Sequence, residues 1–243
     1  MKTLIYSHFF RRPGHAGYRG AMLPGVLDLW YDHLRGPGCY TGDVLLFTNV
    51  EGLRRPGLMT RPMSHVPVDS HEGYLQRVLT HHDVPVRNYD VVMQMDMDIL
   101  AIADVAPLFP TDERLWAAPS DLRTLDGKNA WTLIPRWRRV LHKVSGWRMR
   151  EPGVSACVIA CASAAWERHL SAWARAIQAH GNRPLPPLLD QSFLNLLWLK
   201  GTVPMACWPP ELICHRDWDT AGGARLLHFP GRRKQEMQRF RVV

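Results

Sequence analysis

The sequence lacks any long hydrophobic run, and no apolar stretch approaches the ~18 residues that a membrane-spanning helix needs. Its first residues, MKTLIYSHFFRRPG, contain only a short apolar stretch and no small-residue cleavage site, unlike a signal peptide. Cysteine is scarce: the five cysteines are odd in number and show no C-x-x-C spacing, which argues against a disulfide framework and a cysteine-based zinc site. We therefore expect a cytoplasmic protein with reduced thiols.

Acidic residues are the minority charge, with 22 Asp and Glu against 30 Lys and Arg, for a formal net charge of +8. This excess favours an anionic partner, whether nucleic acid, an acidic membrane surface or a phosphorylated small molecule. However, no block of five consecutive basic residues is present. The sequence has 10 tryptophans, a residue type that lines carbohydrate sites but more often fills cores and interfaces.

Short apolar segments predict the strands. They are TLIYSH (3–8), DVLLFTN (43–49), YDVVMQMDMD, LWAAPS (115–120), GVSACVIACA (153–162), TVPMACW and ARLLHF. Between them, apolar residues at helical spacing predict helices, one capped by Ser163 and one closed by Gly201. Apolar strands that alternate with helices form a largely parallel sheet covered on both faces. Because no long linker is present, we expect one α/β domain over residues 1–243.

Two polar stretches interrupt the alternation of strands and helices. Residues 51–63 are rich in Arg, Pro and Gly and predict a loop. Residues 121–150 are polar, basic and contain tryptophan. They predict an irregular excursion, either over a ligand or as a surface loop.

Two carboxylates, Asp96 and Asp98, stand one residue apart at the end of the apolar segment VVMQM. Like charges repel, and a buried charge without a partner is costly. In an extended segment both side chains point to the same face, so their oxygens would converge on one cation that cancels their charge. Oxygen ligands of this kind suit magnesium or manganese. The alternative is an acidic turn at the surface, but the apolar segment VVMQM directly before the two aspartates makes a surface position less favourable.

Two further patterns offer polar groups near the C-terminus. In LLHFPGRRK, His228 offers an imidazole, Gly231 a close backbone approach and Lys234 a positive charge, together a cradle for a diphosphate. The alternative is an ordinary basic tail. In LLDQSFLN, Asp190 and Gln191 lie in the first turn of a helix. A carboxylate there either complements the helix dipole or hydrogen bonds to a sugar hydroxyl.

With these patterns in this order, the chain resembles the family 8 retaining glycosyltransferases, the group of glycogenin and the bacterial galactosyltransferases, over most of its length. YDVVMQMDMDILAIADVAPLF is similar to the core segment of that family, GVSACVIACASAAWERH to its acceptor-side strand and helix, and HFPGRRK to its H-x-x-G-x-x-K pattern. The chain departs from the family at Ser155-Ala156-Cys157, where the family has Asn, then Ser or Ala, then Gly.

The resemblance implies the GT-A fold of the nucleotide-diphospho-sugar transferases as a single domain. Residues 1–110 would mainly bind the nucleotide, and residues 111–243 would form mainly the acceptor side with a C-terminal diphosphate-binding segment. It also implies that Asp96, Asp98 and His228 bind a divalent cation, Mn²⁺ or Mg²⁺.

The same resemblance assigns residues to the nucleotide sugar. Asp190 and Gln191 would be the catalytic residues that face the donor sugar, with Gln191 near the anomeric carbon. The other donor-binding residues would be Ser7 and His8 at the nucleobase, Arg77 on the helix before the two aspartates, and Gly231 and Lys234 at the diphosphate.

The reaction that the resemblance implies moves a hexose from a nucleotide-diphosphate sugar, UDP-glucose or UDP-galactose, to a hydroxyl of a glycan, a lipopolysaccharide core or a small molecule. Retention by double displacement uses a carboxylate nucleophile. Gln191 is not one, so attack on the face from which the diphosphate leaves is favoured.

Basic residues would also allow peripheral association with a membrane. One alternative is a basic, metal-dependent nucleic-acid-binding protein or nuclease, and another is a sugar nucleotidyltransferase on a similar fold. Neither alternative explains the Asp-Gln pair and the H-x-x-G-x-x-K pattern together, so nucleic acid is not the expected partner.

Overall fold

The computed structural model describes residues 1–10, 25–64, 70–123, 152–180, 189–215, 218 and 222–241. Its centre is a seven-stranded sheet with the strand order β3-β2-β1-β4-β7-β6-β8. The strands are β1 (Thr3–Phe9), β2 (Asp43–Thr48), β3 (Leu58–Pro62), β4 (Val91–Met95), β6 (Leu115–Arg123), β7 (Pro152–Ala162) and β8 (Met205–Cys207). Of these strands only β7 runs antiparallel to its neighbours, and the other pairs are parallel. The expected α/β class with a mostly parallel sheet is confirmed.

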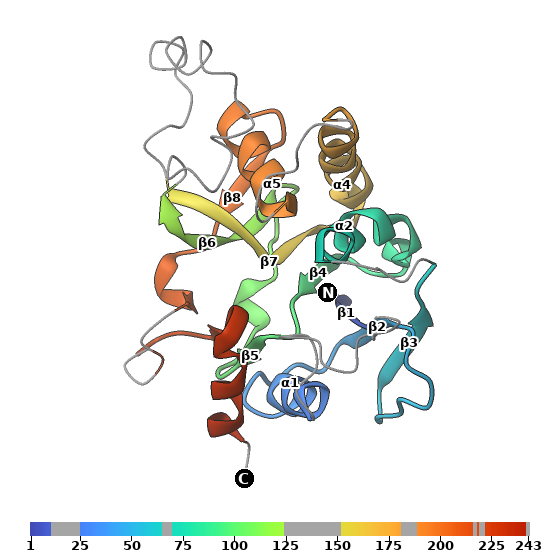
Figure 1. Ribbon diagram of the computed structural model, residues 1–243, viewed down its shortest axis with the longest axis vertical. Coiled ribbons are helices and arrows are strands. Elements are labelled where there is room, and N and C mark those ends of the chain that lie inside the picture. The colour runs from blue at the N-terminus through green and yellow to red at the C-terminus, as the bar shows by residue number, and fades with distance from the viewer. Residues whose placement is uncertain are drawn as a thin grey trace.

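Helices cover both faces of this sheet, as the apolar strands predicted (Figure 1). The helices are α1 (Val26–Arg35), α2 (Ser70–Leu79), α4 (Ser163–Gln178) and α5 (Leu189–Lys200). In β1, Leu4 and Tyr6 pack with α2, α4 and α5, whereas Ile5 packs with α1 on the other face. This alternation follows from the two-residue period of a strand.

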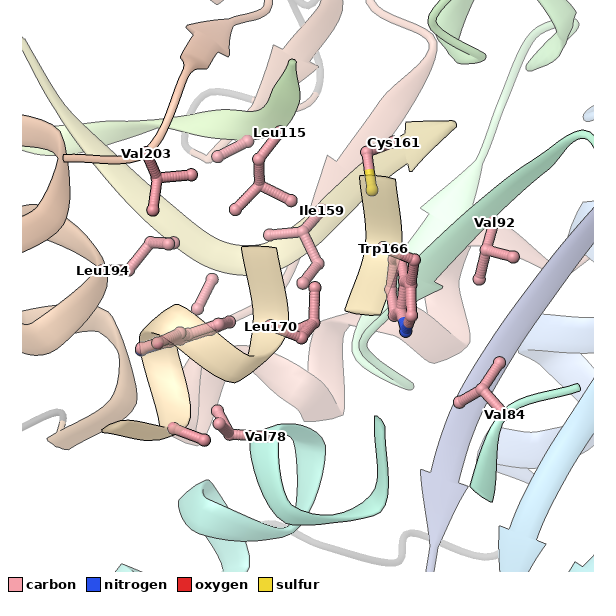
Figure 2. Packing of buried hydrophobic residues seen from close by; sticks show 14 of the residues in the cluster. Val78, Val84, Val92, Leu115, Ile159, Cys161, Trp166, Leu170, Leu194 and Val203 are labelled. Atoms are coloured by element: carbon pink, nitrogen blue, oxygen red, sulfur yellow. The ribbon is translucent and has the colours of Figure 1, made fainter. Parts of the chain in front are cut away.

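The larger core lies between the sheet and α2, α4 and α5. Figure 2 shows Trp166 and Leu170 of α4 close to Ile159 and Cys161 of β7, with Val78 of α2 across from them. All five side chains are fully buried. Burial of large apolar side chains stabilises a fold by about 1.5–3 kcal/mol each. The tryptophans that fill the core without exposure are Trp30, Trp166 and Trp173.

A second, three-stranded sheet places the C-terminal segment next to β5 (Ile99–Ala101), which follows the end of β4. Its strands are β5, β9 (Ile213–Cys214) and β10 (Leu226–His228), in the order β5-β10-β9. β10 pairs antiparallel with β5, which sets His228 opposite Ile99. The basic segment that follows forms a 3-10 helix, η7 (Gly231–Phe240). Shorter 3-10 helices among the described residues are η1 (Thr80–Asp83), η2 (Val86–Asn88), η3 (Ala106–Leu108) and η5 (Pro210–Leu212).

Two expectations about local structure are wrong. The segment 51–63 contains β3, an edge strand whose side chains are mostly exposed, so its sequence shows no apolar alternation. Ser163 does not cap α4, because β7 continues to Ala162 and Ser163 is the first helical residue. The end of α5 is as predicted, since Gly201 follows it at φ +63°. Most of the excursion expected at 121–150 lies outside the described residues.

Among the described helices, none is both long and apolar enough to cross a bilayer.

Candidate active site

Asp96 and Asp98 lie in a turn between β4 and β5, not in the extended segment that the sequence suggested. The amide of Ile99 donates to the Asp96 carbonyl over 3.2 Å, which closes the turn. The amide of Asp96 donates to the carbonyl of Cys157 in β7 over 2.9 Å. The turn follows the carboxyl end of a parallel strand, the edge where open α/β sheets bind ligands.

Asp98 is surrounded by groups from the C-terminal segment. Lys234 Nζ lies 3.1 Å from Asp98 Oδ2, and His228 Nε2 lies 3.7 Å from Asp98 Oδ1. Burial acts to raise the pKa of Asp98, but Lys234 and His228 outweigh it and hold that pKa below the usual range. Asp98 Oδ1 is buried and accepts no hydrogen bond from the described residues. One oxygen of this carboxylate therefore keeps an acceptor position that no described hydrogen bond fills.

Asp96 belongs to a different set of contacts. Its Oδ1 accepts a hydrogen bond from Gln94 Nε2 over 2.9 Å, and its Oδ2 lies 3.2 Å from Arg77 Nη1. Burial raises the pKa of Asp96 to about 6, against the opposing effect of Arg77. Arg77 thus pairs with Asp96, and Lys234 pairs with Asp98. The sequence spacing predicted a metal ion as the partner of both aspartates and did not predict these two ion pairs.

Arg77 of α2 joins three elements at the site. Its Nε lies 2.8 Å from Asp190 Oδ2 at the start of α5, and its Nη1 donates to the carbonyl of Ala156 in β7 over 2.8 Å. The side chain of Asp190 is only 3% exposed, and burial raises its pKa although Arg77 opposes this. Burial acts to lower the Arg77 pKa, but Asp190 and Asp96 keep it above its usual value.

Gln191 is held toward the site by β7. Its Oε1 accepts a hydrogen bond from Ser155 Oγ over 3.2 Å. One turn along α5, buried Asn195 accepts from the Val154 amide over 2.9 Å and donates to the Val154 carbonyl over 2.7 Å. These bonds fix the first turn of α5 against β7, so Asp190 and Gln191 have a defined position.

His215 fixes the proton positions of His228. His215 Nε2 lies 2.7 Å from the carbonyl oxygen of Pro119, which can only accept, so this nitrogen carries a proton. In the neutral ring, Nδ1 of His215 is then an acceptor, and His228 Nδ1 donates to it over 2.8 Å. His228 therefore directs Nε2 to Asp98. Outer hydrogen bonds of this kind orient metal-binding histidines.

Cys157 offers a second ligand set around His228. One ligand atom from each of Cys157, His215 and His228 lies within 4.8 Å of the others. However, burial, with a contribution from Asp96, raises the pKa of the Cys157 thiol, and only a thiolate binds metal well. Both nitrogens of His215 also have hydrogen-bond partners. The oxygen and imidazole atoms of Asp98 and His228 are therefore the better placed ligands.

The remaining residues singled out from the sequence lie at the same edge of the sheet. Tyr6 pairs with Gln94, so Ser7 and His8, near the end of β1, lie beside the end of β4. Ser7 is buried, while His8 stacks on Phe47 and shares a 2.8 Å hydrogen bond with Thr80 Oγ1. Burial, followed by Arg77, lowers the pKa of His8 to about 3, so its ring is neutral.

Gly231 begins η7 with a backbone φ of +63°, which residues other than glycine rarely adopt. A Cβ there would meet nothing within 4 Å, so the backbone conformation rather than crowding favours glycine. The turn that Gly231 permits starts the 3-10 helix that brings Lys234 to Asp98.

The donor set fits a divalent cation. Three carboxylates, of Asp96, Asp98 and Asp190, face two permanent cations among the described side chains that contact them. A buried Asp98 oxygen without a hydrogen bond faces an imidazole nitrogen at 3.7 Å, too far for a hydrogen bond. Carboxylate and imidazole are ligands that manganese accepts.

No protein-family model matches this sequence, and a comparison with curated proteins found no similar one. The fold alone defines the class of the protein, an α/β protein with a mostly parallel sheet. At one edge of that sheet it holds a buried cluster of carboxylate, guanidinium, ammonium and imidazole groups.

Sequence reasoning missed three residues of this cluster: Gln94, His215 and Cys157. Gln94 was visible as the one polar residue within the apolar segment VVMQM. His215 has no sequence signal, because the hydrogen bond that gives it a role crosses to another strand.

Proposed function

We propose that the chain is a metal-dependent retaining glycosyltransferase of the GT-A fold, which moves a hexose from a nucleotide-diphosphate sugar to an acceptor hydroxyl. One observation carries the proposal: Asp98, His228 and Lys234 converge although more than a hundred residues separate Asp98 from the other two. A carboxylate and an imidazole beside an ammonium group form a site for a cation and a diphosphate together.

In the proposed reaction, the bond from the anomeric carbon to the diphosphate breaks, and the nucleoside diphosphate leaves with negative charge. A divalent cation held by Asp98 and His228, with Asp96 beside them, would supply Lewis-acid stabilisation of that charge. Lys234 would add a positive charge at the same place.

The carboxylate of Asp190 is a poor candidate for a nucleophile, because Arg77 Nε lies 2.8 Å from it. Gln191 is not a carboxylate, and its amide oxygen accepts from Ser155. We therefore favour attack by the acceptor hydroxyl on the face from which the diphosphate leaves, with transfer of the hydroxyl proton to the leaving phosphate oxygen. Double displacement would need a free carboxylate beside the anomeric carbon.

The test is a panel of nucleotide sugars, incubated with the purified chain and Mn²⁺, with and without carbohydrate acceptors. We expect release of a nucleoside diphosphate, fastest with UDP-glucose or UDP-galactose. Asp98→Asn should lower that rate by about 100-fold or more, because a metal contributes several kcal/mol to transition-state stabilisation. Asp32→Asn, an exposed carboxylate in α1, is the matched control and should leave the rate unchanged.

Two outcomes would contradict the proposal. Release of pyrophosphate instead of nucleoside diphosphate would indicate a sugar nucleotidyltransferase. Manganese-dependent cleavage of DNA or RNA, with no turnover of any nucleotide sugar, would indicate a nuclease.

A further inference from the structure

A further group of side chains that could hold a metal ion lies where η1 follows α2 and meets α4. It consists of His81 and His82 from η1 and Glu167 from α4. None of them belongs to the ligand sets described above.

The three side chains converge on a small volume. His82 Nδ1 lies 2.8 Å from Glu167 Oε1, and His81 Nε2 lies 3.9 Å from the same oxygen. One ligand atom from each residue lies within 4.8 Å of the other two. The centroids of the two imidazole rings lie 3.7 Å apart, and the ring planes are tilted by 40° to each other. Small shifts of the exposed His82 and Glu167 side chains would let all three atoms reach one ion at the usual ~2.0–2.2 Å.

His81 has a fixed proton arrangement. It is 1% exposed, whereas the His82 side chain is 62% exposed. Its Nδ1 donates to the carbonyl of Val78, which can only accept, so the neutral ring presents the lone pair of Nε2 to Glu167. Burial lowers the pKa of His81, which keeps the ring neutral. A backbone acceptor on the other ring nitrogen is the usual support of a metal-binding histidine.

Ser171 of α4 also contacts this group. Ser171 Oγ lies 3.3 Å from His81 Nε2 and 3.3 Å from Glu167 Oε1. A hydroxyl has one hydrogen, so it donates to only one of these two acceptors at a time. When it donates to His81, Glu167 accepts instead from His82 Nδ1, 2.8 Å away, and a cation held by the three ligand atoms would take the place of that proton.

We propose that His81, His82 and Glu167 form a zinc site that joins η1 to α4. Two imidazoles and one carboxylate are a zinc ligand set, and three protein ligands leave a fourth position for water. Magnesium prefers oxygen ligands, and a pair of imidazoles suits zinc better than manganese, so this site favours zinc over the ions expected at Asp98. Because the ligands come from two elements, bound zinc would stabilise the folded state by linkage.

The experiment is a zinc titration by calorimetry in the His228→Ala parent, because His228 belongs to both other ligand groups. We expect one equivalent of bound zinc, no binding of Mg²⁺, and a thermal midpoint that rises with zinc. His82→Ala and Glu167→Gln in this parent should each weaken zinc binding by more than about 10-fold, since loss of an outer partner alone has that effect. Glu211→Gln, an exposed carboxylate in η5, is the matched control.

A second measurement avoids the parent substitution. Native mass spectrometry of the otherwise unchanged chain should show one fewer zinc for His82→Ala than for the wild type. The proposal is wrong if the His228→Ala parent takes up no zinc, or if His82→Ala and Glu167→Gln bind zinc as tightly as Glu211→Gln does. Both substituted side chains are exposed, so circular dichroism should show the variants folded.

Discussion

Replacing Arg77 by methionine tests whether its buried ion pairs hold the candidate site together. The substitution keeps most of the aliphatic stem but removes the guanidinium group that contacts Asp96, Asp190 and the Ala156 carbonyl. The side chains of Asp190 and Asp96 are 3% and 23% exposed, so two carboxylates would stay largely buried without their cation. Loss of one partner of a buried pair costs about 3–5 kcal/mol. We expect a decrease of that size in the free energy of unfolding.

The measurement is urea denaturation followed by tryptophan fluorescence, for which the buried Trp166 is a suitable probe. Arg35→Met is the matched control, because Arg35 donates to backbone carbonyls of Tyr40 and Gly42 and pairs with no carboxylate among the described residues. We expect it to cost less than Arg77→Met.

A second substitution separates charge from packing. Adding Asp190→Asn to Arg77→Met removes one of the unpaired carboxylates, so the double variant should regain about 1 kcal/mol or more. Two results would contradict this stabilising role of the ion pairs. One is a free energy of unfolding for Arg77→Met within about 1 kcal/mol of the wild-type value. The other is a further decrease in that free energy when Asp190→Asn is added.

The remaining predictions concern the histidine pair and one glycine. His228→Ala should abolish high-affinity Mn²⁺ binding, and His215→Ala should weaken it by about 10–100-fold because the orientation of His228 is lost; titrations followed by electron paramagnetic resonance measure both. Equal manganese affinity in the His215→Ala variant would show that the hydrogen bond between the two rings has no positioning role. Gly201→Ala should destabilise the fold by about 1–2 kcal/mol, because an alanine is strained at φ +63°. Gly222→Ala has open space around its Cβ and no positive φ, so a similar loss there would contradict that explanation.

Local sequence patterns were enough to predict most of the fold. The continuous apolar runs of the buried strands and the apolar spacing of the helices are both visible in the sequence. Thus β1, β7 and α4 lie close to where their patterns indicated. The edge strand β3 was missed because it is mostly exposed and its pairing with β2, not its composition, makes it a strand.

The sequence by itself also determined which residues could carry charge at the site. The aspartates after β4, the Asp-Gln pair at the start of α5 and the segment from His228 to Lys234 were all recognisable from residue type and spacing. No local sequence pattern shows which of these charged side chains form ion pairs with each other. Asp98 contacts Lys234 and His228, whereas Asp96 contacts Arg77.

The tertiary structure alone decided those pairings and the proton positions of His228. Antiparallel pairing of β5 with β10 brings residues together that are far apart in the sequence. A hydrogen bond that His228 donates to His215, itself oriented by the Pro119 carbonyl, then selects the ring nitrogen that His228 presents to Asp98. Such contacts act over a few ångströms in space and leave no spacing in the chain, so they become visible only once the sheets have formed.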